Sequence, residues 1–337
     1  MAVRLMTDSA SSIPKEDIET YNLCIIPMVL IDGDRSLSED TIDYDEFYAH
    51  LAQVDYLPTT SQPTPESLRS ALLEILDAGN EVLAVLLPKT LSGTIDQLAL
   101  AMERIADERP ETRDHMRLID GEAPCMQEGY AVLAGAKCAQ AGGNLDACAA
   151  AVEAAKQRTR FIFAPRSLDY LERGGRIGRA SALLGGLLKL VPILTIEEAA
   201  ASAYTKVRTY PKALITIRDK LASDIKNSGG LKNICVHFIV DTDQARAFCK
   251  NLIEPLVNMT VPLVQVSPVV GANVGPAIGV VYETIDPIAP LRSGSMRGRL
   301  SDVRLPDLSG LLGRRENENE STGGNTPSNN PRTKEAK

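Results

Sequence analysis

Apolar and polar residues alternate in blocks along the first half of the chain. Continuous apolar runs bounded by turn residues, typical of buried strands, occupy 3–9, 23–31, 81–88 and 116–120. Between them apolar residues recur at helical spacing, and Pro27 predicts an edge or a bulge in the second run. Strands that alternate with helices in this way predict an α/β fold with a mostly parallel sheet flanked by helices.

The second half repeats the mixture of strands and helices. A strand pattern at 233–240 lies between helical patterns at 211–226 and 242–253, an apolar run follows at 262–270, and 275–283 closes the unit. We therefore predict an N-terminal α/β domain at 1–158 and a second α/β domain at 159–286. The segment 287–337 is rich in Ser, Gly, Asn and charged residues and has little to bury, so we expect a disordered tail.

Composition narrows the classes of function. The 337 residues are 44% hydrophobic, and a net charge of -8 argues against nonspecific nucleic-acid binding. Lys189 and Pro192 break the longest apolar run, so we expect no membrane insertion. The six cysteines form no CxxC pair and the three histidines have no metal-ligand spacing, which predicts a cytoplasmic protein without a metal site.

Two polar turns with the same design precede predicted helices. In "LPTTSQPTPESL" (57–68), Thr64 is a natural N-cap before Pro65, whereas Thr60 and Ser61 have no such structural role. In "PKTLSGT" (88–94), Gly93 allows close backbone approach, and Ser92 or Thr94 can cap the helix or face a ligand. Plain helix capping explains each turn alone, but two matching turns favour a ligand site.

The chemistry of both turns suits a carboxylate. In an open α/β sheet the two turns would lie at the carboxyl ends of strands, where ligands bind. Helix N-termini with hydroxyl donors favour an anion, and Lys89 is the single cation within either turn. A phosphate usually recruits more positive charge or a glycine-rich loop, whereas neutral donors can hold a carboxylate.

The motif "LERGGRIGRASALLGGLLKLVPIL" (171–194) joins a basic cluster to an apolar run. Arg173, Arg176 and Arg179 surround a glycine pair, which as plain structure is a helix C-cap with solvated cations. Gly185, Gly186 and Leu187 lie in the apolar run, which is either tightly packed core or the wall of a tunnel.

Several ordered blocks resemble the signature of DegV proteins. These blocks are "TDSASSIP" (7–14), "TSQPTPE" (60–66), "LSGT" (91–94), "LDYLERGGRIGRASALLGGLLKLVPIL" (168–194), "KVRT" (206–209) and "GPAIGVVYE" (275–283). The resemblance covers about residues 3–284 and implies a two-domain DegV-like fold that binds one long-chain fatty acid. It further implies a non-catalytic subunit, which presents the bound carboxylate to a separate ATP-binding fatty acid kinase subunit for conversion to acyl phosphate.

The resemblance also implies residue roles. Thr60, Ser61 and Ser92 would bind the carboxylate with Thr94 in support. Asn273, which stands where the family commonly has a histidine, would also face the carboxylate. Arg173 and Arg176 would dock the kinase subunit. Gly185, Gly186 and Leu187 would line an acyl tunnel between the domains, with fatty acid as the ligand and no cofactor.

Two other functions remain open. One is a stand-alone hydrolase or transferase that uses Ser92, although no GxSxG elbow or nearby base accompanies this serine. The other is a lipid-sensing regulator whose tail recruits partners.

Overall fold

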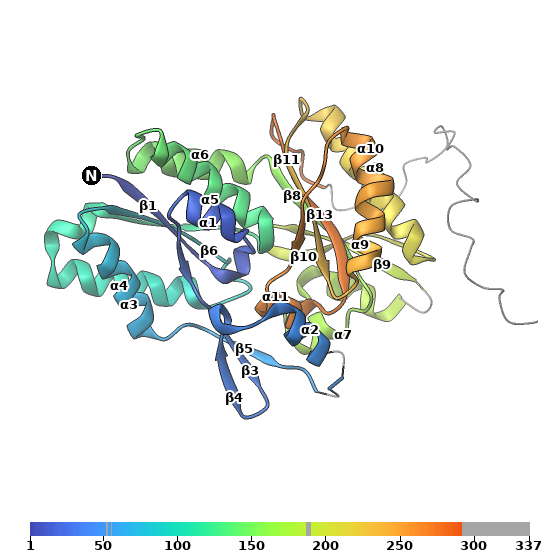
Figure 1. Ribbon diagram of the computed structural model, residues 1–337, viewed down its shortest axis with the longest axis horizontal. Helices are drawn as coiled ribbons and strands as arrows, with labels where there is room; N and C mark the ends of the chain where they lie inside the picture. Colours follow the sequence, from blue (N-terminus) through green and yellow to red (C-terminus); the bar gives the residue numbers. More distant parts are fainter. Residues whose placement is uncertain (52, 55, 187–189, 292–337) are drawn as a thin grey trace, which may run out of the picture. The chain divides into compact units, whose positions relative to one another are not determined.

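Four parallel strands form the sheet of the first half, in the order β2-β1-β6-β7 (Figure 1). They are β1 (Val3–Asp8), β2 (Cys24–Ile26), β6 (Glu81–Leu86) and β7 (Met116–Asp120). The structure is a computed structural model, and it describes residues 1–51, 53–54, 56–186 and 190–291. The predicted parallel sheet is confirmed, with the strand that precedes Pro27 at its edge.

Helices cover both faces of this sheet because its strands are apolar on both sides. Met6 and Val82 pack into the core beneath one helix pair, whereas Leu5 and Leu83 pack into the core on the opposite face. The first pair is α3 (Pro65–Asp77) and α4 (Thr94–Glu108), and the second is α5 (Cys125–Gln140) and α6 (Leu145–Lys156). This is the buried strand pattern expected of a doubly covered parallel sheet.

A small antiparallel sheet corrects two predictions about the first half. Its order is β4-β3-β5, formed by β3 (Val29–Asp32), β4 (Arg35–Ser38) and β5 (Thr59–Ser61). The run 23–31 is therefore two strands in different sheets, because Pro27 lies between them. The polar stretch at 59–61 is itself a strand rather than a turn, because its backbone pairs with β3.

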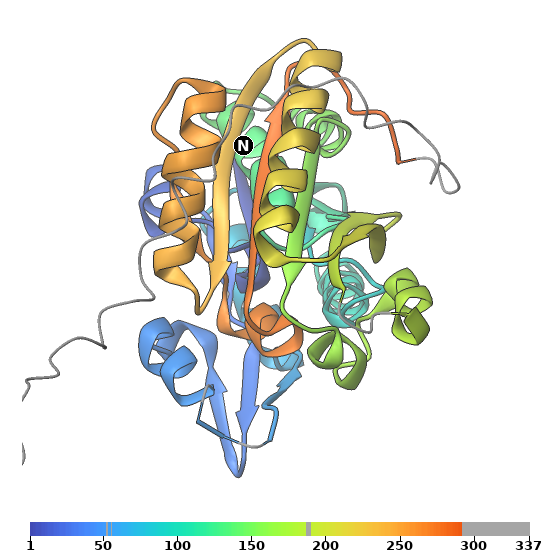
Figure 2. The same cartoon turned by 90° about the vertical axis from the view of Figure 1, so that its right-hand side faces the viewer.

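Six strands form the sheet of the second half, in the order β10-β9-β8-β13-β11-β12. They are β8 (Thr159–Pro165), β9 (Val191–Glu197), β10 (Ala200–Val207), β11 (Leu231–Ile239), β12 (Leu263–Gln265) and β13 (Ala277–Thr284). All neighbours are antiparallel except β11 and β12. Figure 2 shows α8 (Tyr210–Asn227) lying along the outer face of this sheet.

Helix α5 is buried between the two sheets, which explains its apolar and alanine-rich sequence. It packs against β1 on one side and against β8 and β13 on the other. The remaining helices are short: η1 (Ser9–Ser11), α1 (Lys15–Thr20), η2 (Glu39–Thr41), α2 (Tyr44–Leu51), η3 (Pro110–His115), α7 (Asp169–Arg173), η4 (Gly178–Gly186), α9 (Thr242–Phe248), the π-helical turn Cys249–Ile253, α10 (Glu254–Val257) and α11 (Pro268–Val274). The apolar run 262–270 thus contains β12 and the start of α11.

The chain stays anchored beyond the last strand. The backbone N–H of Leu291 donates to the Glu197 carboxylate at 3.0 Å, and that of Ile288 donates to the Gln157 carbonyl at 2.9 Å. Ordered contacts therefore continue past the predicted start of the tail at 287, and the rest of the tail, 292–337, lies outside the described residues. Residues 1–291 form one compact unit, and the division at 158/159 stays a prediction.

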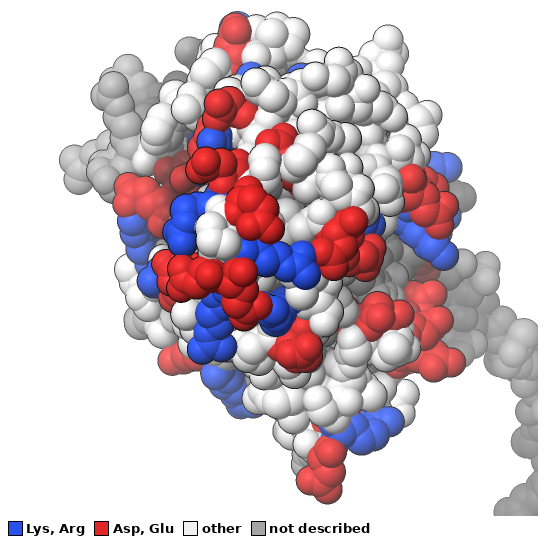
Figure 3. Space-filling model, turned by 90° about the vertical axis from the view of Figure 1, so that its left-hand side faces the viewer, with Lys and Arg blue, Asp and Glu red and all other residues white. Residues whose placement is uncertain are grey.

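Charged side chains of opposite sign are paired over the outer helices of the first half. Arg4 contacts Glu74 at 3.0 Å, and further pairs join α3 to the end of α4. Figure 3 shows basic and acidic side chains interspersed on this side of the molecule. Within the described residues, no helix is long and apolar enough to cross a membrane, and no three His, Cys, Asp or Glu side chains form a group that could hold a metal ion.

Candidate functional site

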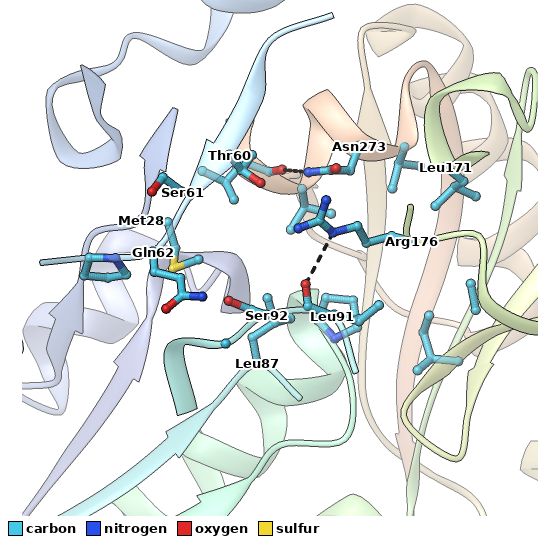
Figure 4. Close-up of a pocket in the computed structure, with 18 of the residues that line it drawn as sticks. Met28, Thr60, Ser61, Gln62, Leu87, Leu91, Ser92, Leu171, Arg176 and Asn273 are labelled. Carbon is cyan, nitrogen blue, oxygen red and sulfur yellow. Dashed lines mark hydrogen bonds between the residues drawn. The ribbon is translucent and has the colours of Figure 1, made fainter. Parts of the chain in front are cut away.

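A cavity of about 570 Å³ is lined by residues of both halves of the chain. Its volume falls within the range of about 300–1,000 Å³ that is usual for small-molecule sites. The lining comes from β5, the loop before α4, β8, α7, the β9–β10 hairpin and α11. Segments more than two hundred residues apart in sequence therefore meet around one space (Figure 4).

Strand β5 supplies the first polar part of the wall. Thr60 pairs with Leu30 of β3, which fixes the backbone of the threonine at the cavity edge. Thr60 is half-buried and Ser61 is exposed, and both line the cavity. Neighbouring side chains of a strand leave opposite faces, and Figure 4 shows Thr60 nearer than Ser61 to Asn273. Thr60 is thus the better placed of the two predicted ligands.

The loop before α4 supplies the second polar part. The Ser92 hydroxyl lies 2.9 Å from the Thr94 hydroxyl and accepts the Thr94 N–H at 3.3 Å. Thr94 is fully buried, with its hydroxyl 3.6 Å from the Met28 sulfur. When Thr94 donates to Ser92 instead, the Ser92 proton is free to face the cavity. This turn follows β6 at the carboxyl end of the parallel sheet, as predicted. The other turn does not follow a strand of that sheet.

Gly93 allows the two polar segments to touch. A Cβ at this position would lie 2.3 Å from the side-chain nitrogen of Gln62, which is closer than real contacts allow. Thr64 caps α3 by accepting the Ser67 N–H at 3.2 Å, and Pro65 opens that helix, as predicted. Capping therefore explains Thr64, whereas Gln62 and Ser92 are packed around the cavity.

Two glutamines of the lining were missed by the sequence reasoning. The side-chain oxygens of Gln62 and Gln97 are buried and have no hydrogen-bond partner among the described residues. Buried amide groups without partners are uncommon, and either amide can rotate to present its NH₂ instead. A polar group of a bound molecule would satisfy both. Gln62 lies inside the polar stretch 57–68, which is the one signal that could have identified it.

Arg176 enters the cavity because of the way α7 ends. Gly175 has a φ of +72°, and its N–H donates to the Glu172 carbonyl at 3.0 Å. The N–H of Arg176 donates to the Leu171 carbonyl at 2.9 Å. These two bonds form a Schellman motif, in which glycine adopts the left-handed conformation at little cost. The chain thereby reverses and directs Arg176 away from the exposed surface of α7.

The guanidinium of Arg176 is the single charged group among the described lining residues. Its Nε donates to the Leu91 carbonyl at 3.4 Å, and its Nη1 donates to the Gly174 carbonyl. Figure 4 shows the guanidinium facing the space between Thr60 and Ser92. The sequence pattern had grouped Arg176 with Arg173 as a surface cluster. Arg173 is exposed and makes no ion pair or hydrogen bond to a residue that the structure describes.

Asn273 lines the cavity from α11. Its side-chain nitrogen donates to the Val269 carbonyl at 2.9 Å, one turn earlier in the helix. The first turn of α11 is itself fixed by Glu39, whose carboxylate accepts the Val269 N–H at 2.9 Å. A carboxylate suits a helix N-terminus, although burial raises the pKa of Glu39.

The buried side of the cavity is apolar. Phe161 and Phe163 of β8, Leu171 of α7 and Val270 and Val274 of α11 form most of it. The predicted tunnel residues fall elsewhere on the chain. Gly185 and Gly186 end η4, Leu187 lies outside the described residues, and their role stays a prediction. The cavity as described suits a largely apolar molecule that carries one anionic group.

Comparison with known proteins agrees with the resemblance seen in the sequence. Residues 2–284 match the model of the DegV family of uncharacterised proteins. A DegV domain-containing protein of Clostridium perfringens is 35% identical over 283 residues, which cover 84% of this chain and 99% of that protein. One from Clostridium acetobutylicum is 31% identical over 290 residues, covering 84% and 98%.

Two solved structures have the same fold. DegV of Bacillus subtilis, described as a fatty acid binding protein, has a TM-score of 0.75 and 26% identity, covering 84% of this chain and 99% of its own. A stearic acid-binding protein of Eubacterium ventriosum has a TM-score of 0.76 and 21% identity, covering 83% and 97%. The observed α/β architecture is therefore shared across these relatives.

Proposed function

The chain belongs to the DegV family, and from this membership and the geometry of the cavity we propose that it binds one long-chain fatty acid. The observation that carries the proposal is an apolar cavity whose described lining contains one charged side chain, Arg176. A fatty acid is complementary to this lining, because it has a long apolar chain and a single anionic group. The Bacillus subtilis and Thermus thermophilus relatives, each 26% identical, are described as fatty acid binding.

The two parts of the ligand would contribute differently. Burial yields about 0.8 kcal/mol per methylene, so a chain of about sixteen carbons gains on the order of ten kcal/mol before ordering costs. The carboxylate would accept hydrogen bonds from Arg176, Ser92 and Thr60, and a rotated Gln62 amide could add another donor. The acyl chain thus supplies most of the affinity, and the polar groups select an acid and fix its orientation.

Replacing the acid by the alcohol of the same chain length tests this division. We expect the wild-type protein to bind the acid at least about tenfold more tightly than the alcohol, because a charge-assisted hydrogen bond is worth about 1.5–3 kcal/mol. Arg176→Ala should remove most of that preference, whereas Arg173→Ala should preserve it. Equal affinity of the wild-type protein for acid and alcohol would contradict the proposed headgroup site.

We further propose that the chain acts in the cytoplasm as a non-catalytic subunit that presents the carboxylate to a fatty acid kinase subunit. Two features support docking near the polar end of the cavity. Arg173 is exposed and has no partner among the described residues, and it lies three residues from Arg176 of the cavity wall. An unpaired arginine beside a ligand site can attract an acidic surface of a partner.

A reconstituted reaction tests the docking role. With a kinase subunit, ATP and fatty acid, Arg173→Glu should lower acyl phosphate formation at least about tenfold, because the reversed charge would repel the partner. Fatty acid binding by the same variant should be unchanged. Full acyl phosphate formation by Arg173→Glu would show that this arginine is not a docking residue.

A further inference from the structure

Phe161 and Phe163 stand between the cavity and a second, smaller space. Both belong to β8 and lie two residues apart, so their side chains leave the same face of the sheet. Their ring centroids are 4.7 Å apart with an interplanar angle of 24°, which is a stacked pair. The two rings line the large cavity and also line a space of about 10 Å³ behind it, together with Val270 and Val274.

The smaller space is apolar although a histidine lies beside it. His237 accepts the Met126 N–H with Nε2 at 3.1 Å, and its Nδ1 is 2.9 Å from the Val264 carbonyl, so both ring nitrogens are engaged. Burial lowers the pKa of His237 to about 4, which keeps the ring neutral. A space of this size could hold about one water, but apolar voids stay dry. Its walls lose dispersion contacts that an alkyl group could supply.

Gly279 determines where the two rings lie. It pairs directly with Phe163 across β13 and β8. A Cβ on Gly279 would lie 2.5 Å from the Cβ of Phe163 and 2.8 Å from the ring of Phe161. A side chain at this position would therefore press on the Phe161 ring and on β8 itself, at the Cβ of Phe163 and, at 2.8 Å, the backbone oxygen of Ile162. The absence of a side chain lets the rings rest against β13.

We propose that Phe161 and Phe163, positioned by Gly279, form the end wall that sets the length of the acyl chain that this protein accepts. The inference rests on the proposed fatty acid binding. The polar groups of the cavity are half-buried or exposed, whereas the two rings are 6% and 3% exposed, so the methyl end of a bound chain meets the rings. A slightly longer chain could push the two rings into the small space behind them.

A series of saturated acids from about 12 to about 22 carbons locates the wall. Each methylene should raise affinity about fourfold until the chain reaches the rings, after which affinity stops rising. We call the chain length at which affinity stops rising the break. Phe161→Ala joins the two spaces and should move the break about two or more carbons toward longer acids. Gly279→Ala adds a methyl group that presses on β8 and on the Phe161 ring, and it should move the break about one or two carbons toward shorter acids.

Two further variants keep the test decisive. Phe161→Leu removes less volume and should shift the break in the same direction by a smaller amount if Phe161→Ala does not fold. Phe248→Leu changes a buried phenylalanine in the core that contains α8 and α9 and should leave the break in place. An unmoved break in the Phe161 and Gly279 variants would overturn this inference while leaving fatty acid binding intact. A wild-type protein that binds no acid of the series would overturn the proposed function, and this inference with it.

Discussion

The cavity has two unlike walls, one polar and one aromatic. The polar wall consists of side chains at the ends of elements: Thr60 on a short strand, Ser92 in a loop and Arg176 after a helix. The aromatic wall consists of Phe161 and Phe163 in the interior of a central strand, both buried. Polar groups at element ends can be exchanged at small cost to the fold, whereas residues within a paired strand serve the core and the ligand together.

The largest expected contrast between the walls is in stability. Phe163→Ala should lower the free energy of unfolding by about 3–5 kcal/mol, because it leaves a cavity beside the stacked ring of Phe161. Ser92→Ala should change it by less than about 1 kcal/mol. Urea denaturation of ligand-free protein measures both. Equal losses would mean that the polar wall is as much a part of the core as the aromatic one.

The pH dependence of stability sharpens the same contrast, because His237 packs edge-on against Phe161. Burial lowers the pKa of His237 from 6.5 to about 4. Between these values the unfolded chain takes up a proton that the folded chain does not, so stability falls as the pH falls. The loss should reach about 3 kcal/mol by pH 4, at 1.4 kcal/mol per unit.

Asp8 has the opposite effect on the pH dependence of stability, so a variant is needed to isolate the contribution of His237. Burial raises the pKa of Asp8 from 3.8 to about 7, so the folded chain holds that proton longer and gains stability as the pH falls. The measurement is therefore the difference in free energy of unfolding between the wild-type protein and His237→Asn, taken from pH 7 to pH 4 by urea denaturation. A difference that stays constant would mean that His237 binds its proton equally well in the folded and the unfolded chain.

The smallest expected effect distinguishes a hydroxyl that faces the cavity, Ser92, from one that caps a helix, Thr209. Ser92→Ala should weaken fatty acid binding by about fivefold, the value of one hydrogen bond of about 1 kcal/mol, with little loss of stability. Thr209→Ala removes the N-cap that accepts the Lys212 N–H at 3.4 Å and should cost about 1 kcal/mol of stability without changing affinity. Calorimetric titration would measure affinity and thermal melts would measure stability for both variants. If both variants lost affinity and stability to the same extent, this prediction would be wrong.

Much of the fold could be predicted because its signals are local. The continuous apolar runs at β1 and β6 and the cap at Thr64 each depend on a few neighbouring residues. The strand at Thr59–Ser61 was read as a turn, because it exists only through pairing with β3, about thirty residues away. The start of α11 was not distinguished from the rest of the apolar run 262–270, since short apolar runs fit both periods.

The candidate site was only partly predictable. Ser92 and Thr60 were identified from polar turns, and they do line the cavity. Arg176 was placed on the surface with Arg173, because nothing in the local sequence shows where a Schellman turn directs the next side chain. Phe161 and Phe163 were not singled out from the sequence, because their relation to an empty space depends on Gly279, more than one hundred residues later.

Native mass spectrometry of the purified protein tests the central claim most directly. We predict one bound molecule per chain with the mass of a long-chain fatty acid, released on denaturation, and a lower occupancy in Arg176→Ala when fatty acid is limiting. A chain that carries no ligand even after incubation with fatty acids, or one that retains a ligand without a carboxylate, would contradict it.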